Sequence, residues 1–106
     1  MALDKASIVR PVLRKQTVPV ETLGGEVILR QLTLSEMLEL GNDSRQGATR
    51  EHEIARVLSW CAIDADGHPL LSIDEWQAWG ASCLDDAVNL YKVVISLTGL
   101  EKKTTD

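Results

Sequence analysis

Two aspartates in the stretch Asp64-Ala65-Asp66-Gly67 are the side chains whose type and spacing most suggest a metal site. An EF-hand calcium loop needs oxygen ligands at alternate positions, glycine at the sixth position and a bidentate glutamate at the twelfth. Counting from Asp64 puts Glu75 at the twelfth position, but Pro69 then occupies the sixth. Counting Gly67 as the sixth leaves apolar residues at the first and twelfth positions. The stretch therefore indicates a turn between two short strands rather than a calcium site.

Zinc binding and nucleophilic catalysis are indicated no more strongly. No cysteine or second histidine stands at zinc-ligand spacing from His52 or His68. The serines to consider stand at expected helix starts, where helix capping explains them: Ser35, Ser72 and Ser82. Cys83 is the remaining candidate nucleophile, because a helix N-terminus can activate a thiol. The sequence carries no assembled catalytic or metal-binding set, and it predicts a non-enzymatic protein without a cofactor that acts by binding other proteins.

A β-hairpin is the clearest signal among the elements that must position a binding surface. β-branched residues mark a strand over Thr17–Glu21, and side chains alternate in a second strand over Glu26–Gln31. Gly24-Gly25 between them supplies the positive φ that a tight turn needs. Pro19 has no N–H, so its strand is expected at the edge of a sheet. A lone hairpin is marginal, so it must pack on helices or self-associate with another chain through its open edge.

Three or four helices are expected after the hairpin. Thr33 with Glu36, and Ser72 with Glu75, form capping-box patterns that open two of them. Apolar spacing and stop signals predict a first helix from Thr33 to the stop at Gly41-Asn42, then a loop over 41–49 and a second helix over 50–62. A short helix follows from Ser72 through about Ala78–Ala81, and a last helix runs from Ser82 to the stop at Gly99. We therefore expect an α+β fold, mostly α-helical, with an N-terminal β-hairpin.

The inward helix faces should be aliphatic, because the chain has no phenylalanine and a single tyrosine. The first helix offers Leu34, Met37, Leu38 and Leu40, and the last offers Leu84, Ala87, Val88, Tyr91, Val94 or Ile95, and Thr98. Trp76 and Trp79 share one face of the short helix. Core packing is favoured for this pair over an interface role. The candidate partner-binding residues, from the hairpin and this pair, are Val18, Val20, Leu23, Val27, Leu29, Trp76 and Trp79.

Length and charge limit the function further. A chain of 106 residues forms at most one domain, and the net charge of −5 is unevenly spread. Residues 1–16 are expected to form a flexible basic arm, residues 17–100 a single α+β domain and residues 101–106 a disordered polar tail. An acidic body disfavours nucleic acid as a partner. Without a membrane-spanning apolar run or a secretory signal, and with two cysteines expected as free thiols, the protein is predicted to be cytoplasmic.

Three motifs resemble, in order and spacing, those of siphophage tail assembly chaperones. The hairpin from Val18 to Arg30 leads into Leu32-Thr33-Leu34-Ser35-Glu36, as the family's "GG-x-V-x-V-R" leads into "L-T-x-x-E". Asp64-Ala65-Asp66-Gly67-His68-Pro69-Leu70 resembles its "D-x-D-G-x-P-L" turn, and Leu97-Thr98-Gly99-Leu100 its closing "L-N/S-G-L". The similarity spans roughly residues 3–100. Leu23 and Leu71 stand where family members often carry aromatic residues, which puts an aromatic-anchored contact in doubt.

The resemblance implies a phage or prophage protein that works during virion assembly in the bacterial host cytoplasm. Such chaperones coat the tape measure protein and recruit tail tube subunits around it, so these two proteins are the expected partners. Two alternatives stay open: a structural tail component, such as a connector or terminator subunit retained in the virion, or a small enzyme that uses Cys83.

Overall fold

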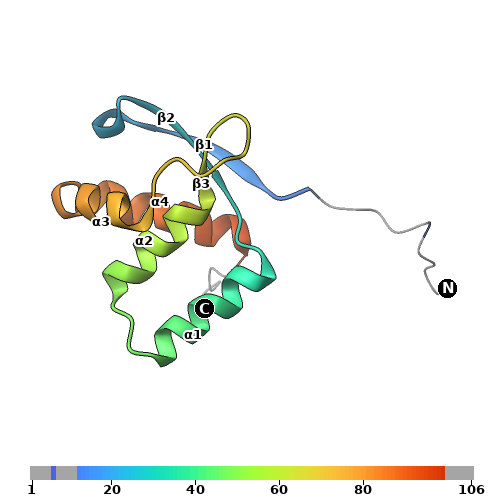
Figure 1. Ribbon diagram of the computed structural model, residues 1–106. Coiled ribbons are helices and arrows are strands. Elements are labelled where there is room, and N and C mark those ends of the chain that lie inside the picture. The colour runs from blue at the N-terminus through green and yellow to red at the C-terminus, as the bar shows by residue number, and fades with distance from the viewer. Residues whose placement is uncertain (1–5, 7–11, 100–106) are drawn as a thin grey trace, which may run out of the picture.

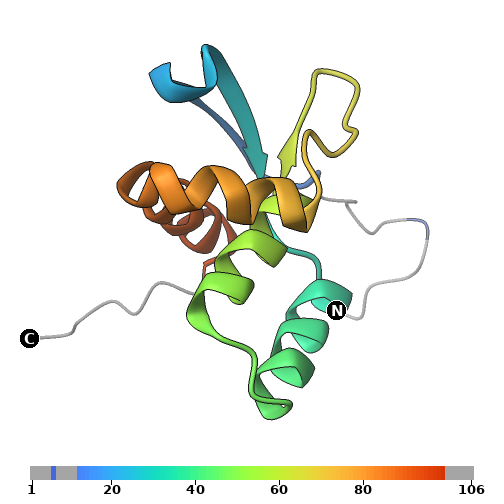
Figure 2. The ribbon, with the colours of Figure 1, turned by 60° about the vertical axis from the view of Figure 1, so that its left-hand side comes forward.

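A computed structural model of the chain describes Ala6 and residues 12–99 (Figure 1). An antiparallel sheet lies on one side of the molecule, and three helices pack together against it, with the first helix standing beside the second and away from the sheet (Figures 1 and 2). The elements in chain order are β1 (Lys15–Val20), the 3-10 helix η2 (Glu21–Leu23), β2 (Gly25–Arg30), α1 (Leu34–Arg45), α2 (Arg50–Cys61), β3 (Ala62–Ile63), α3 (Ile73–Ser82) and α4 (Leu84–Thr98). The predicted α+β class, mostly helical with an N-terminal hairpin, is confirmed.

The hairpin forms where the sequence predicts it, with β1 beginning at Lys15 rather than Thr17. Gly24 has a φ of 81° and closes the turn, whereas Gly25 already belongs to β2. The strand order is β1-β2-β3, so the strand that contains Pro19 is an edge strand, as predicted. The N–H of Gln31 donates to the carbonyl of Arg14. Because hydrogen-bonded pairs alternate along an antiparallel ladder, this bond places Pro19 at a position whose backbone faces the open edge.

Helix α1 is longer than predicted. The expected stop at Gly41-Asn42 is wrong, because the helix continues to Arg45 and the left-handed glycine that follows it is Gly47, with a φ of 85°. Tertiary contacts hold the extra turn: Asp43 Oδ2 lies 3.6 Å from Arg56 Nε and 3.7 Å from His52 Nε2 on α2. The predicted loop over 41–49 is therefore confined to the residues between α1 and α2.

Only part of the apolar face predicted for the first helix packs against the core. Met37 and Leu40 are half-buried and pack against the core, but Leu34 and Leu38 are 73% and 68% exposed. The two leucines are four residues apart and so lie on one side of the helix. This stripe is left without a covering element among the described residues.

The segment after α2 forms the predicted strand and turn. The antiparallel partner of Ile63 beyond the turn is Pro69, in an isolated bridge, so the second short strand is reduced to one residue. Asp64 Oδ1 accepts hydrogen bonds from the N–H groups of Asp66 (2.8 Å) and His68 (3.0 Å). Gly67 adopts the positive φ (89°) that completes the turn.

The last two helices confirm one cap and correct another. Ser72 and Glu75 make both hydrogen bonds of a capping box at the start of α3, and Gly99, with a φ of 85°, ends α4. Ser82, however, is the last residue of α3, and Cys83 is the N-cap of α4 without a side-chain cap bond. The predicted inward face of α4 is also rotated at its start, because Leu84 is 61% exposed.

One apolar core joins the sheet to α2, α3 and α4. Its largest fully buried side chains come from these four parts and from the link between β2 and α1: Leu29, Leu32, Val57, Leu58, Cys61, Trp76, Leu90 and Val94. Lys15 and Gln16, assigned to the predicted arm, belong to β1; most of the arm and the whole 101–106 tail lie outside the described residues.

Candidate functional site

Four of the seven candidate partner-binding residues are part of the core. Val20, Val27, Leu29 and Trp76 are at most 6% exposed, so these side chains stabilise the fold and do not form an open surface. Their alternation in the hairpin turns them towards the helices, which is why the same pattern predicted both roles. The remaining three are half-buried at the edge of the core: Val18, Leu23 and Trp79. Trp79 packs edge-to-face on Trp76, with ring centroids 5.3 Å apart.

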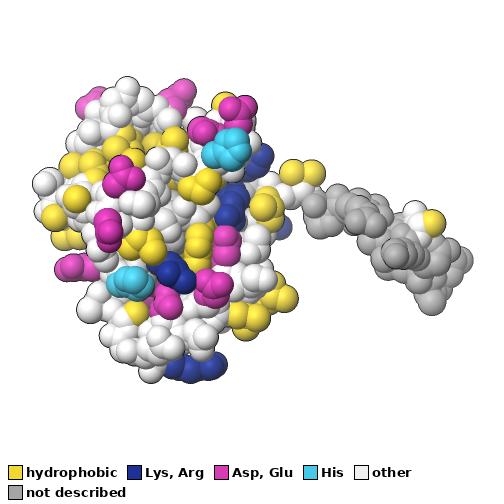
Figure 3. All heavy atoms as spheres, in the orientation of Figure 1, with side chains coloured by type: hydrophobic (Ala, Val, Ile, Leu, Met, Phe, Trp, Pro, Cys, Tyr) yellow, Lys and Arg dark blue, Asp and Glu magenta, His cyan; other side chains and the backbone are white. Residues whose placement is uncertain are grey.

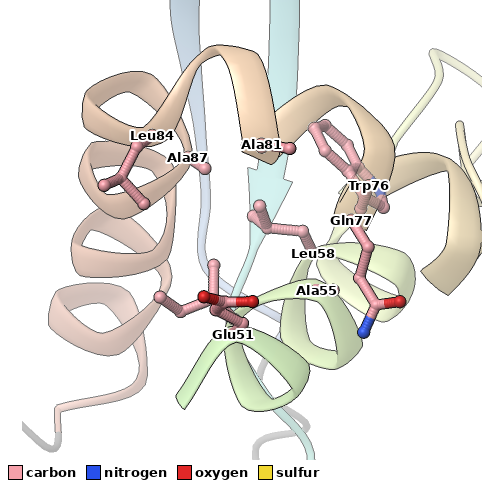
Figure 4. A pocket seen from close by; sticks show the side chains of 10 residues that line it. Glu51, Ala55, Leu58, Trp76, Gln77, Ala81, Leu84 and Ala87 are labelled. Carbon is pink, nitrogen blue, oxygen red and sulfur yellow. The ribbon is translucent and has the colours of Figure 1, made fainter. Parts of the chain in front are cut away.

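A groove of about 470 Å³ opens between α2 on one side and α3 with the start of α4 on the other (Figure 4). Its floor is apolar and buried, and consists of Ile54, Ala55, Leu58, Trp76 and Ala87. Its rim is exposed and consists of Glu51, Gln77, Ala81 and Leu84, with Gly80 between floor and rim. Figure 4 shows Leu84 and Glu51 on opposite walls. The sequence prediction missed this site because its two walls, residues 51–58 and 76–87, are 18 to 36 residues apart along the chain.

Of the residues that the structure describes, Glu51 is the one charged residue that lines the groove, and further carboxylates lie on the helices that form its walls. Between Arg56 and Lys92 the sequence holds six carboxylates and no lysine or arginine: Asp64, Asp66, Asp74, Glu75, Asp85 and Asp86. Four of these lie on α3 and on the first turn of α4, which form one wall. In Figure 3 hydrophobic and acidic side chains lie together over α3, at the left of the view.

The arginines of the opposite wall are engaged elsewhere. Arg50 lies over the Tyr91 ring, 5.4 Å from its centroid, and Arg56 lies over the Trp60 ring at 4.9 Å. Arg56 also donates to Glu39 on α1 at 3.0 Å. Glu51 is therefore the charged side chain that α2 places at the groove.

A partly buried ion pair fixes α1 to the end of β2. Arg30 binds Glu36 through two hydrogen bonds, Nη1 to Oε1 (2.8 Å) and Nη2 to Oε2 (2.7 Å), while Glu36 completes the capping box with Thr33. Burial works to raise the pKa of Glu36, but the hydrogen bonds from Arg30 and from the Thr33 backbone outweigh it and hold that pKa below its usual value. Burial also raises the pKa of the neighbouring Cys61 thiol to about 12, which leaves it protonated and inert.

A second partly buried contact joins α2 to α4. The Tyr91 hydroxyl donates to Glu53 Oε2. Burial, followed by this hydrogen bond to a carboxylate, raises the pKa of Tyr91 to about 12. Both contacts hold elements together and neither faces the groove's rim.

Among the described residues, no hydrogen bond joins Cys83 or a candidate serine to His52 or His68. Within residues 12–99, the cluster whose ligand atoms come near enough for a metal is Asp64, Asp66 and His68. Asp64 already uses Oδ1 to hold the turn, and the backbone hydrogen bond from His68 is the main cause of its lowered pKa. Cys61 and Cys83 are free thiols, Cys61 buried and Cys83 half-buried. No described helix combines the length and apolar character that crossing a membrane requires.

Comparison with solved structures finds a protein of similar fold. Neither a model of a known family nor a curated protein matches the sequence. The fold resembles that of a phage tail assembly chaperone. The solved structure it matches is the bacteriophage HK97 tail assembly chaperone, with a TM-score of 0.64, 20% sequence identity, and coverage of 87% of this chain and 88% of that one.

Proposed function

We propose that the protein is a tail assembly chaperone of a bacteriophage or prophage. It binds the tape measure protein in the host cytoplasm and recruits tail tube subunits during tail morphogenesis. The observation that carries this proposal is the fold match, which extends over nearly the full length of both chains. The three sequence motifs support it independently, because their order and spacing were recognised from the residues alone.

The described surface suits temporary binding of another protein. A chaperone that is later displaced needs apolar contact area that stays exposed in the free protein without unfolding it. The groove between α2, α3 and α4 provides such an area, and the Leu34–Leu38 stripe on α1 provides another. Several weak contacts of this kind together give strong binding, and the partner can still be released because each contact breaks separately.

Co-purification tests the proposal. The tagged full chain is co-expressed with the tape measure protein encoded by the same phage, and the complex is sought by affinity capture followed by size-exclusion chromatography. We expect the two proteins to elute together, and an unrelated coiled-coil protein of similar charge to be left behind. Separate elution of two folded proteins would contradict the proposal.

A second measurement separates a chaperone from a subunit that remains in the particle. Mass spectrometry of purified virions should detect the tail tube and tape measure proteins but not this chain. Its presence at a fixed stoichiometry would instead identify a connector or terminator subunit.

A further inference from the structure

We propose that the groove between α2, α3 and α4 binds an amphipathic helix with an apolar stripe and lysine or arginine along its flanks. This inference rests on the proposed function only for the biological source of that helix, which is then a segment of a tail protein. The binding chemistry follows from the groove itself.

The groove has the shape and lining of a helix-binding site. A helix in such a groove inserts apolar side chains spaced at i, i+3 or i+4, and i+7. The floor offers the apolar surface of Ile54, Leu58 and Trp76, and the rim offers Leu84, which is 61% exposed in the free chain. Polar groups converge poorly here, because the lining includes one carboxylate and one amide side chain, from Glu51 and Gln77. A small polar ligand needs several placed polar groups, so an apolar helix face fits better.

Small residues line the α3 side of the groove. Gly80 and Ala81 are adjacent on α3, and Ala87 faces them from α4. Glycine inside a helix costs roughly 1 kcal/mol relative to alanine. A Cβ at Gly80 would meet Ala87 Cβ at 3.6 Å, an ordinary contact, so packing within the chain does not demand glycine. Gly80 and Ala81 therefore present little side-chain bulk where α3 lines the groove.

Charge selects the kind of helix. Glu51 on α2 stands at the rim of the groove, and Asp74 and Asp85 add negative charge on the helices of the opposite wall. Glu75 is engaged in the α3 capping box, and Asp86 Oδ2 accepts a hydrogen bond from the Thr22 hydroxyl. A basic flank would be attracted by Glu51, Asp74 and Asp85, and an acidic flank would be repelled. The exposed stripe of α1 in a second copy is a poor occupant because it lacks basic flanks. Arg45 is the one basic residue of α1, and the helix's three carboxylates pair with Arg30 and Arg56.

Peptide binding measures this directly. The probe is a fluorescently labelled helical peptide with leucines at i, i+3, i+4 and i+7 and lysines beside them; its matched control has glutamates in place of the lysines. Fluorescence anisotropy is recorded with the full chain at low ionic strength. We expect saturable binding of the lysine peptide, and roughly tenfold or greater weakening for the glutamate peptide. Added salt should reduce the difference in affinity between the two peptides.

Two pairs of variants locate the site. Leu84→Ser should weaken binding of the lysine peptide about tenfold through lost apolar contact, whereas Leu70→Ser, at an exposed position outside the groove, should leave it unchanged. Glu51→Lys should weaken peptide binding several-fold. Glu26→Lys, at an exposed position of β2, makes the same change in net charge away from the groove. All four side chains are exposed, so urea unfolding is expected to confirm that each variant folds.

Specific results would overturn the inference. Equal binding by the Leu84→Ser and Leu70→Ser variants would place the peptide elsewhere, and equal binding of both peptides would remove the charge selection. The basic arm of the chain itself is the rival occupant, and Val9→Asp in the full chain tests it: tighter peptide binding by this variant would show that the arm competes for the groove. If peptide binding holds while co-purification with the tape measure fails, the groove inference stands and the proposed function falls.

Discussion

Replacing Glu36 with alanine tests how α1 is attached to the rest of the molecule. The change removes both hydrogen bonds to Arg30 and leaves that guanidinium, whose side chain is 17% exposed, without its carboxylate partner. It also removes the acceptor for the Thr33 N–H at the start of α1.

The magnitude follows from two losses. Breaking a buried ion pair from one side costs about 3–5 kcal/mol, and the residual exposure of this pair reduces that figure. Loss of the cap bond adds about 0.5–1 kcal/mol. We therefore expect the free energy of unfolding to fall by roughly 2–4 kcal/mol, measured by urea denaturation with tryptophan fluorescence.

The chain contains its own matched control. Glu75 forms the same capping box with Ser72 at the start of α3, but no arginine within the described part of the chain pairs with it. Glu75→Ala should cost only about 1 kcal/mol. Equal losses for the Glu36 and Glu75 variants would refute a stabilising role for the Arg30 pair.

The same pair predicts a dependence on pH. The folded-state pKa of Glu36 is lowered, so the pair's contribution is fully present above the unfolded pKa near 4.5. It is lost as the pH falls through the lower folded value. The stability difference between wild type and Glu36→Ala should therefore shrink in acid, and a difference that grew there would contradict this assignment.

Three further outcomes follow from the core and the titratable groups. Trp76→Ala should lower the free energy of unfolding, measured by urea denaturation, by about 3–5 kcal/mol. Trp76→Phe should lower it by much less, because the buried indole N–H has no acceptor to lose; similar losses for both variants would contradict this. At pH 8, a thiol reagent should modify Cys83 in the folded chain and reach Cys61 only after unfolding, so two fast thiols would refute the burial of Cys61. Tyr91, followed by absorbance, should ionise near pH 12, and its contribution to stability should disappear as pH rises from about 10 through 12. Glu53→Gln should lower the midpoint of this Tyr91 titration, and an unchanged midpoint would argue against the hydrogen bond.

Local signals made part of the fold predictable. The capping boxes at Thr33 and Ser72, the turn at Gly24 and the stop at Gly99 each depend on neighbours within a few residues, and each is present in the structure. Pro19 placed its strand at the sheet edge for an equally local reason, the missing N–H.

The sequence predictions were wrong where contacts between residues far apart in the chain determine the structure. Gly41 reads as a helix stop, but the contacts of Asp43 with α2 extend the helix past it. Spacing showed that Leu34 and Leu84 lie on apolar helix faces, yet the angle at which each helix packs leaves both exposed. The groove is of this kind, since Glu51 and Leu84 become its opposite rims only through the packing of α2 beside α4.

A role in tail assembly is tested most directly in the phage that encodes the chain. Its reading frame is interrupted by an early stop codon, and particles from the lysate are counted by electron microscopy, with and without the intact gene supplied in trans. We expect heads without normal tails, and complete tails once the gene is restored. Normal numbers of full-length tails in the absence of this protein would contradict the proposed function.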